Sequence, residues 1–436
     1  MRNGTCEGCL RYAVRRNSSA VAYCSLSIGR GTSDEGSFPE GIAHFVEHTI
    51  FRGTASKSAA VISGYLDRLG GELNAYTTKE EIVLHATTLK EDLWKAVGLL
   101  FELATQPTFP ESEIETERTV VLDEIISYKD NPAEDVYDNF ESMLFEGHPL
   151  GRRILGTQAS VKKITAGQLR AFVSENFVPG NMALSIVANV DESVLEKKVL
   201  RFANKLFANS GGPTLRGLKL FLGVSQKFCP TPDTPEFPSC HFDQGQEGRA
   251  EKSPFNKVVD KHNHEVNAVI GGFAPSLYEM PDRLVAAMLV NILGGPASNS
   301  LLNKELREKH GWVYSVECSY TQYRDTGIAA ITFGCDKPHL DCCLKAIHRI
   351  LGSLREVPLS ERRLQGFRKQ LLGQIAISSD NGEAQCLSMG KSLLAWNRIP
   401  SNEEIRKTLE AVTSDDLLRM SRRIFAADKL STLIYL

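Results

Sequence analysis

The chain has 436 residues, of which 42% are hydrophobic and 24% charged, and its formal net charge is −3. This balance gives no reason to expect nucleic acid or an anionic membrane surface as a partner. No apolar run approaches the roughly 18 residues that a transmembrane helix needs. The first residues also lack the apolar core of a signal peptide, so we expect a cytoplasmic globular protein of two or three domains.

The first half of the sequence alternates between strand and helix patterns. Apolar residues predict a strand pair at 10–14 and 20–28, followed by a loop to residue 39 and a helical segment near 41–54. The next predicted elements are a helix at 59–69, strands at 72–78 and 81–88, an amphipathic helix at 89–106, helical segments from 111 to about 145 and at 166–176, and a closing strand at 182–188. This order predicts an α+β fold, in which a mostly antiparallel sheet has helices packed on one side.

A proline-rich segment separates the two halves. Residues 211–262 open on Gly-Gly-Pro and contain six prolines, which is typical of a linker. We therefore predict an N-terminal catalytic domain at 1–210, a linker at 211–262 and a C-terminal domain at 263–436. The apolar spacing after Thr165 recurs after Thr413, and each set leads into a final apolar strand. This similarity indicates two related domains that arose by duplication.

The helical segment in the first half carries a candidate metal site. His44 and His48 are four residues apart, so both imidazoles leave the same face of a helix and can bind one divalent metal, usually Zn²⁺. Glu47 lies close enough to take a proton from a water molecule whose pKa the metal has lowered. This H-x-x-E-H pattern is the inverted zincin motif. The alternative is a pair of histidines on the protein surface.

The acidic helix predicted after Pro110 contains candidates for a third metal ligand. Glu117 and Glu124 are seven residues apart and share one helix face. One of them could bind the metal while the other orients a histidine. A solvated acidic face, without a metal, is the alternative at this point.

The segment His44–Thr54, with its sequence HFVEHTIFRGT, resembles the zinc helix of the pitrilysin/insulinase family of inverzincin metallopeptidases, which includes the mitochondrial processing peptidases. The resemblance implies that His44, His48 and Glu124 are the metal ligands. It also implies that Glu47 is the general base and Glu117 a supporting carboxylate.

Two further segments are similar to this family. Residues 306–316, LREKHGWVYSV, resemble its C-terminal signature, and this implies that Arg307 and Tyr314 reach the substrate from the second domain. The segment 73–77 resembles an edge strand beside the zinc, which implies that Asn74, Ala75 and Tyr76 bind an extended substrate. The second half lacks the H-x-x-E-H motif, so we expect one catalytic metal in each chain.

These features together predict a zinc endopeptidase that cleaves unstructured peptides. Because the chain carries both the zinc motif and the Arg/Tyr signature, we expect a homodimer, with a heterodimer containing a related subunit as the alternative. Two other functions stay open at this point. The chain could be a non-catalytic peptide-binding or structural subunit, or a leader-processing peptidase that needs a partner subunit.

Overall fold

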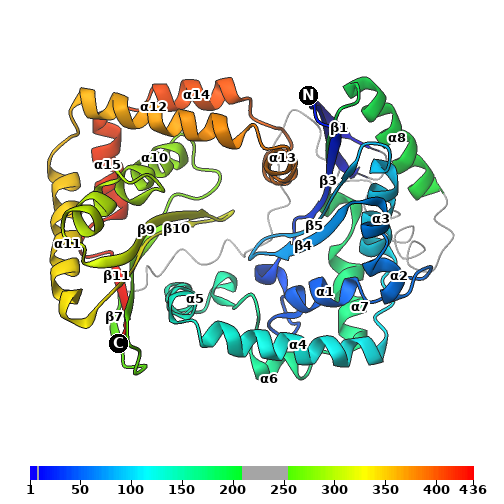
Figure 1. The fold of residues 1–436 in the computed structure, drawn as a ribbon, viewed down its shortest axis with the longest axis horizontal. Helices are drawn as coiled ribbons and strands as arrows, with labels where there is room; N and C mark the ends of the chain where they lie inside the picture. The colour runs from blue at the N-terminus through cyan, green and yellow to red at the C-terminus, as the bar shows by residue number, and fades with distance from the viewer. Residues whose placement is uncertain (7–8, 209–253) are drawn as a thin grey trace, which may run out of the picture. The chain divides into compact units, whose positions relative to one another are not determined.

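The computed structural model describes residues 1–6, 9–208 and 254–436 (Figure 1). Most of the predicted linker lies outside these residues, and residues 256–259 at its end form a strand. The described chain forms two compact units. Unit 1 contains residues 1–125, 152–208 and 378–399, and unit 2 contains residues 126–151, 254–377 and 400–436. Each half of the sequence thus contributes one segment to the unit built mainly by the other half.

Unit 1 is organised on a mixed six-stranded sheet with the order β1-β2-β6-β3-β5-β4. Its strands are β1 (Arg2–Thr5), β2 (Arg11–Arg16), β3 (Val21–Ile28), β4 (Glu72–Thr77), β5 (Ile82–Leu89) and β6 (Met182–Ala188). The strands predicted at 10–14 and 20–28 form as β2 and β3, but their pairing with each other was wrong. β6 lies between them, parallel to β2 and antiparallel to β3. Its sequence, which is apolar except for Ser185, suits this central, fully buried position.

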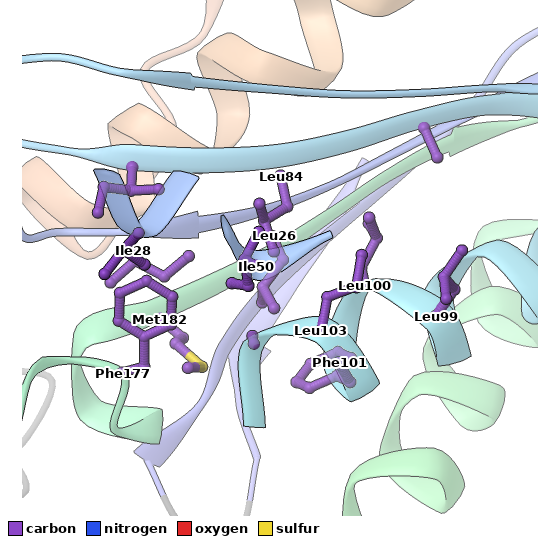
Figure 2. Packing of buried hydrophobic residues seen from close by; sticks show 14 of the residues in the cluster. Leu26, Ile28, Ile50, Leu84, Leu99, Leu100, Phe101, Leu103, Phe177 and Met182 are labelled. Carbon is purple, nitrogen blue, oxygen red and sulfur yellow. The ribbon is translucent and has the colours of Figure 1, made fainter. Parts of the chain in front are cut away.

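Most helices of unit 1 pack on one face of this sheet. They are α1 (Ile42–Ile50), α2 (Ala59–Ser63), α3 (Leu93–Thr105), the greater part of α4 (Glu111–Lys129), α6 (Gln158–Val161), α7 (Ala166–Asn176) and α8 (Glu192–Ala208), with short 3₁₀ turns at Thr32–Asp34, Asp67–Leu69 and Pro179–Asn181. Figure 2 shows part of the core they enclose, including Leu26 of β3, Ile50 of α1 and Leu100 of α3. The helix predicted at 59–69 is interrupted, because α2 ends before Gly64.

The opposite face of this sheet is covered by a helix from the second half of the chain. Helix α13 (Gly382–Trp396) buries Cys386, Met389 and Leu393 against Ala183 and Val187 of β6. The intervening residues of β6 point into the other core, as the two-residue period of a strand requires.

Unit 2 is built on a five-stranded sheet with the order β7-β11-β8-β10-β9. Its strands are β7 (Asn256–Val259), β8 (Val266–Ala274), β9 (Val313–Gln322), β10 (Gly327–Cys335) and β11 (Ser431–Tyr435). Its helices are α5 (Pro132–Leu144), α10 (Asp282–Gly294), a π-helix at Asn303–Lys309, α11 (Leu340–Glu356), α12 (Glu361–Ser378), α14 (Asn402–Glu410) and α15 (Ser414–Ile424), with 3₁₀ turns at Pro149–Gly151 and Lys337–His339. Here α5, from the first half of the chain, covers one face through Val136 and Phe140.

The predicted duplication is confirmed by the connectivity of the two sheets. Apart from the additional β1, both sheets place their five strands in the same order relative to the sequence. The helices α7 and α15 also begin alike, because Thr165 and Thr413 each form a capping box. The predicted α+β class is confirmed. In addition, a helix contributed by the other half of the chain covers the second face of each sheet, α13 in unit 1 and α5 in unit 2. Within the described residues, no helix is both long and apolar enough to span a membrane.

Candidate metal centre

The helix that carries both histidines is held firmly in the core of unit 1. Gly41 precedes α1 with φ = 88°, and a side chain at this position would collide with the backbone of Gly156. The buried carboxylate of Glu35 accepts hydrogen bonds from the backbone N–H groups of Gly41 and Ala43, at 3.0 and 3.1 Å. It therefore satisfies donors that the first turn of a helix leaves unpaired. The start of α1 is thus fixed by Glu35 and by the close approach of Gly41 to Gly156, none of which is a predicted metal ligand.

The side chains of His44, His48 and Glu124 converge, and their potential ligand atoms all lie within 4.8 Å of one another. Oε2 of Glu124 is 3.7 Å from Nε2 of His44 and 3.2 Å from Nε2 of His48. Four tetrahedral ligands at typical zinc bond lengths lie about 3.3 Å apart. The separations between these atoms therefore fit a tetrahedral site with one position left for another ligand.

The pKa of His44 also fits metal binding. Burial and the neighbouring His48 lower the pKa of His44 to about 4, so its imidazole is neutral, as a ligand must be. Burial opposes protonation of His48, but Glu124 and Glu117 outweigh it, and the pKa of His48 is raised. Oε2 of Glu124 is buried and lies near both imidazoles. A buried carboxylate oxygen facing two imidazoles suits a cation between them.

Glu47 lies on α1 next to His48 and is linked to the edge strand of the sheet. Its Oε2 accepts a hydrogen bond of 2.6 Å from the hydroxyl of Thr77, at the end of β4. Burial raises the pKa of Glu47, and the bond from Thr77 acts in the opposite direction. The carboxylate is therefore oriented, and its affinity for a proton is increased.

Glu117 supports the centre from α4. It lies on the buried face of this helix, and its Oε2 is 3.2 Å from Nδ1 of His48. Its other oxygen, Oε1, forms an ion pair with Arg52, which follows the end of α1. A carboxylate on the second ring nitrogen of a ligand histidine fixes the orientation of the ring and its tautomer.

The remaining predicted site residues lie in two places. Asn74, Ala75 and Tyr76 are on β4, which among the described strands pairs only with β5 and is therefore an edge strand as expected. Arg307 and Tyr314 belong to unit 2, where both side chains are exposed and the hydroxyl of Tyr314 donates a hydrogen bond of 2.6 Å to Asp336. The roles predicted for these five residues stay predictions.

Sequence reasoning did not assign roles to Thr77, Arg52 or Glu35. Thr77 and Arg52 both stand inside the segments that carry the family resemblance. Their chemistry becomes visible only when their partners are known, because Thr77 contacts a residue 30 positions away and Arg52 one on another helix. No local pattern marks Glu35 as the carboxylate that caps α1.

Within the described residues, the geometry defines a two-unit α+β protein with a candidate His/His/Glu metal centre, and comparison with known proteins gives its family. The model of the insulinase family (peptidase family M16) matches residues 11–158, and the model of the peptidase M16 inactive domain matches residues 163–371. The chain belongs to peptidase family M16, the insulinase family, as its sequence motifs predicted.

Two bacterial relatives illustrate the similarity along the chain. An uncharacterized zinc protease of Rickettsia felis is 27% identical over 93% of this chain and 90% of its own length. The uncharacterized zinc protease YmxG of Bacillus subtilis is 27% identical over 99% of this chain and 97% of its own length.

Solved structures confirm the fold. A protease from Helicobacter pylori superposes with a TM-score of 0.85 at 19% identity, covering 100% of this chain and 99% of its own. A peptidase M16 inactive domain from Pseudomonas fluorescens has a TM-score of 0.83 at 17% identity, covering 100% of this chain and 97% of its own.

Proposed function

We propose that this protein is a zinc-dependent endopeptidase that cleaves unstructured peptides. The observation that carries the proposal is the convergence of His44, His48 and Glu124, with the carboxylate of Glu47 oriented beside them. The zinc protease names of the relatives support the same conclusion. His44, His48 and Glu124 would hold Zn²⁺, which when bound would act as a Lewis acid toward water and the peptide carbonyl.

Glu47 is the proton carrier in this proposal. One of its carboxylate oxygens accepts a proton from the attacking water, and the same group then delivers a proton to the leaving amine. Burial raises the pKa of Glu47, which increases its affinity for the proton that it must accept. Thr77 keeps the carboxylate in one orientation while the substrate binds.

The peptide would bind to the edge of β4 in an extended conformation. One side of this strand pairs with β5, from Glu72 opposite Thr87 to Thr77 opposite Ile82. The other side is available to pair with the backbone of a peptide at Asn74, Ala75 and Tyr76. Strand addition uses main-chain hydrogen bonds and needs neither terminus of the peptide, so an internal bond of an unfolded chain can be presented.

Arg307 and Tyr314, which belong to unit 2, would bind the substrate. A guanidinium can hold a substrate carbonyl, and a phenol can donate to the developing oxyanion. Tyr314 is 54% exposed and its hydroxyl is bonded to Asp336, so this bond must be exchanged when the substrate arrives. A homodimer is the assembly proposed for a chain that contains all of these residues. Light scattering of the pure protein tests it, and a purely monomeric protein would contradict it.

The function is tested by hydrolysis of a quenched library of unstructured peptides. We expect cleavage by the pure protein that stops on chelation and returns with Zn²⁺. Glu47→Gln is the matched variant, because it keeps the shape of the side chain and should bind zinc while losing roughly 10²-fold to 10⁴-fold of the turnover. Zinc binding without cleavage by the wild-type protein would refute a self-sufficient endopeptidase of unstructured peptides, and full activity of Glu47→Gln would refute the role of Glu47 as proton carrier.

A further inference from the structure

Glu117 is bonded through both carboxylate oxygens, and each oxygen has a different partner. Oε2 faces Nδ1 of His48 at 3.2 Å, and Oε1 forms an ion pair with Nη2 of Arg52. The carboxylate therefore bridges a predicted metal ligand and a guanidinium at the end of the same helix. From this bridge we propose that Arg52 is a positioning residue of the metal centre, acting on His48 through Glu117. The inference rests on the metal site of the proposed function.

The burial of Glu117 explains why a permanent cation is needed there. Its side chain is only 3% exposed. A buried carboxylate is strongly unfavourable unless hydrogen bonds and an opposite charge compensate it. When His48 binds a metal through Nε2 its imidazole is neutral, so it offers Glu117 a hydrogen bond but no full charge. The guanidinium of Arg52 supplies that charge.

A count of the formal charges also indicates that the centre needs the positive charge of Arg52. Glu47, Glu117 and Glu124 carry three negative charges when ionised, and the two ligand histidines are neutral. A divalent metal and Arg52 together carry three positive charges. The loaded centre is therefore electrically balanced only with the guanidinium in place.

Backbone hydrogen bonds fix the loop that carries Arg52, and this restricts where its side chain can lie. The N–H group of Arg52 donates to the carbonyl of Thr49 at 3.0 Å, and that of Thr108 donates to the carbonyl of Gly53 at 3.0 Å. A side chain at Gly53 would lie 2.9 Å from Oγ1 of Thr108. The loop thus lies tightly against the segment leading into α4, the helix that carries Glu117.

The expected consequence of this arrangement is tighter metal binding. A carboxylate that accepts a hydrogen bond from the second nitrogen of a ligand histidine fixes the ring and makes it more basic. Without Arg52, Glu117 can rotate away from Nδ1, and this change weakens the support of the ring. Arg52 itself does not contact the predicted metal position, so its effect must pass through Glu117.

The test measures the affinity of the full chain for Zn²⁺ alone, by competition with a chromophoric chelator. We expect Glu117→Gln to weaken zinc binding roughly 10-fold to 100-fold, as changes in such partners commonly do. Arg52→Met should weaken it about 5-fold to 10-fold, and Arg52→Lys should recover part of the loss because the charge remains. The double variant should bind zinc no more weakly than Glu117→Gln, because the two residues act in series.

Arg2→Met is the matched control, since it removes an arginine–carboxylate pair between β1 and α8. It should leave the affinity for zinc unchanged. Thermal unfolding in chelator identifies any variant that no longer folds. If Arg52→Met does not fold, the affinity of Arg52→Lys for zinc tests the inference instead. Unchanged affinity in the folded Arg52 variants, or losses that multiply in the double variant, would overturn the inference. Zinc binding without peptide cleavage would refute the proposal of a self-sufficient endopeptidase and leave this inference intact.

Discussion

Thr77, at the end of edge strand β4, donates a hydrogen bond of 2.6 Å to Glu47 on the metal-binding helix α1. This bond joins the strand proposed to bind the peptide to the residue proposed to move the proton. It also restricts rotation of the carboxylate, because burial by itself does not define the orientation of the group.

Removing this hydroxyl should lower turnover without removing the metal. A hydrogen bond to a charged group contributes about 1.5–3 kcal/mol, so Thr77→Val should reduce kcat roughly 10-fold to 100-fold. Thr77→Ser keeps the hydroxyl and should retain most of the activity. Peptide hydrolysis and zinc content, measured on both variants, check the prediction. Equal kcat for valine and serine would show that the bond has no catalytic role.

His44→Ala should abolish stable zinc binding, because a His/Glu pair is a poor site for a metal that prefers four ligands. His85→Ala is the control. This histidine belongs to the same unit but pairs with Glu383 of α13, outside the cluster. Metal analysis after dialysis against buffered Zn²⁺ should give full occupancy for His85→Ala and almost none for His44→Ala. Undiminished zinc in His44→Ala would contradict the ligand set.

The buried carboxylate of Glu35 should make unit 1 less stable as the pH rises. Burial raises its pKa from 4.5 to about 8, although Arg152 and two backbone N–H groups oppose the shift. Between these values the folded protein retains a proton that the unfolded chain has released. Stability is therefore highest at the acid end of this window and falls as the pH increases through it.

Glu35→Gln isolates this effect, because the amide oxygen can still accept the bonds from Gly41 and Ala43. From pH 5 to pH 8 in chelator, the wild-type Tm should fall by at least about 3 °C more than the Tm of the variant. Differential scanning calorimetry measures both. Parallel pH profiles would mean that Glu35 is ionised in the folded protein throughout this range.

Helix α13 requires a glycine where it contacts the sheet of unit 1. A Cβ on Gly390 would lie 2.4 Å from Oγ of Ser27, which is buried on β3. Gly390→Ala should therefore destabilise unit 1 by about 1–3 kcal/mol through overpacking. Gly373→Ala, on α12, meets no atom within 4 Å and should stabilise by about 0.5–1 kcal/mol. Thermal unfolding should shift in opposite directions, and similar shifts for both variants would argue against the tight contact.

Local sequence patterns were sufficient for the elements that carry the site. The apolar periodicity around His44 and His48 identified α1, and the acids after Pro110 identified the start of α4. The edge strand β4 was also placed correctly. The interruption after α2 was missed, because apolar spacing alone does not show where a glycine ends a helix.

Local sequence patterns could not predict the order of the strands. They also could not predict that α5 packs in unit 2 and α13 in unit 1. β2 and β3 are adjacent in the sequence, yet β6 separates them in the sheet. The helices α5 and α13 each have a pattern suitable for covering a sheet, but periodicity does not say which sheet. That choice depends on how the apolar faces of whole layers fit, which involves residues far apart in the chain.

The sequence by itself determined which residues are the candidate ligands, because the helical period puts His44 and His48 on one face of α1, and the resemblance to a known family predicted Glu124. Only the tertiary structure decided which groups hold these residues in place. Thr77 reaches Glu47 from a strand, and Arg52 reaches Glu117 on another helix. The physical reason is that spacing along a helix is fixed by its local geometry, whereas a contact between two elements exists only after both have packed into the same core.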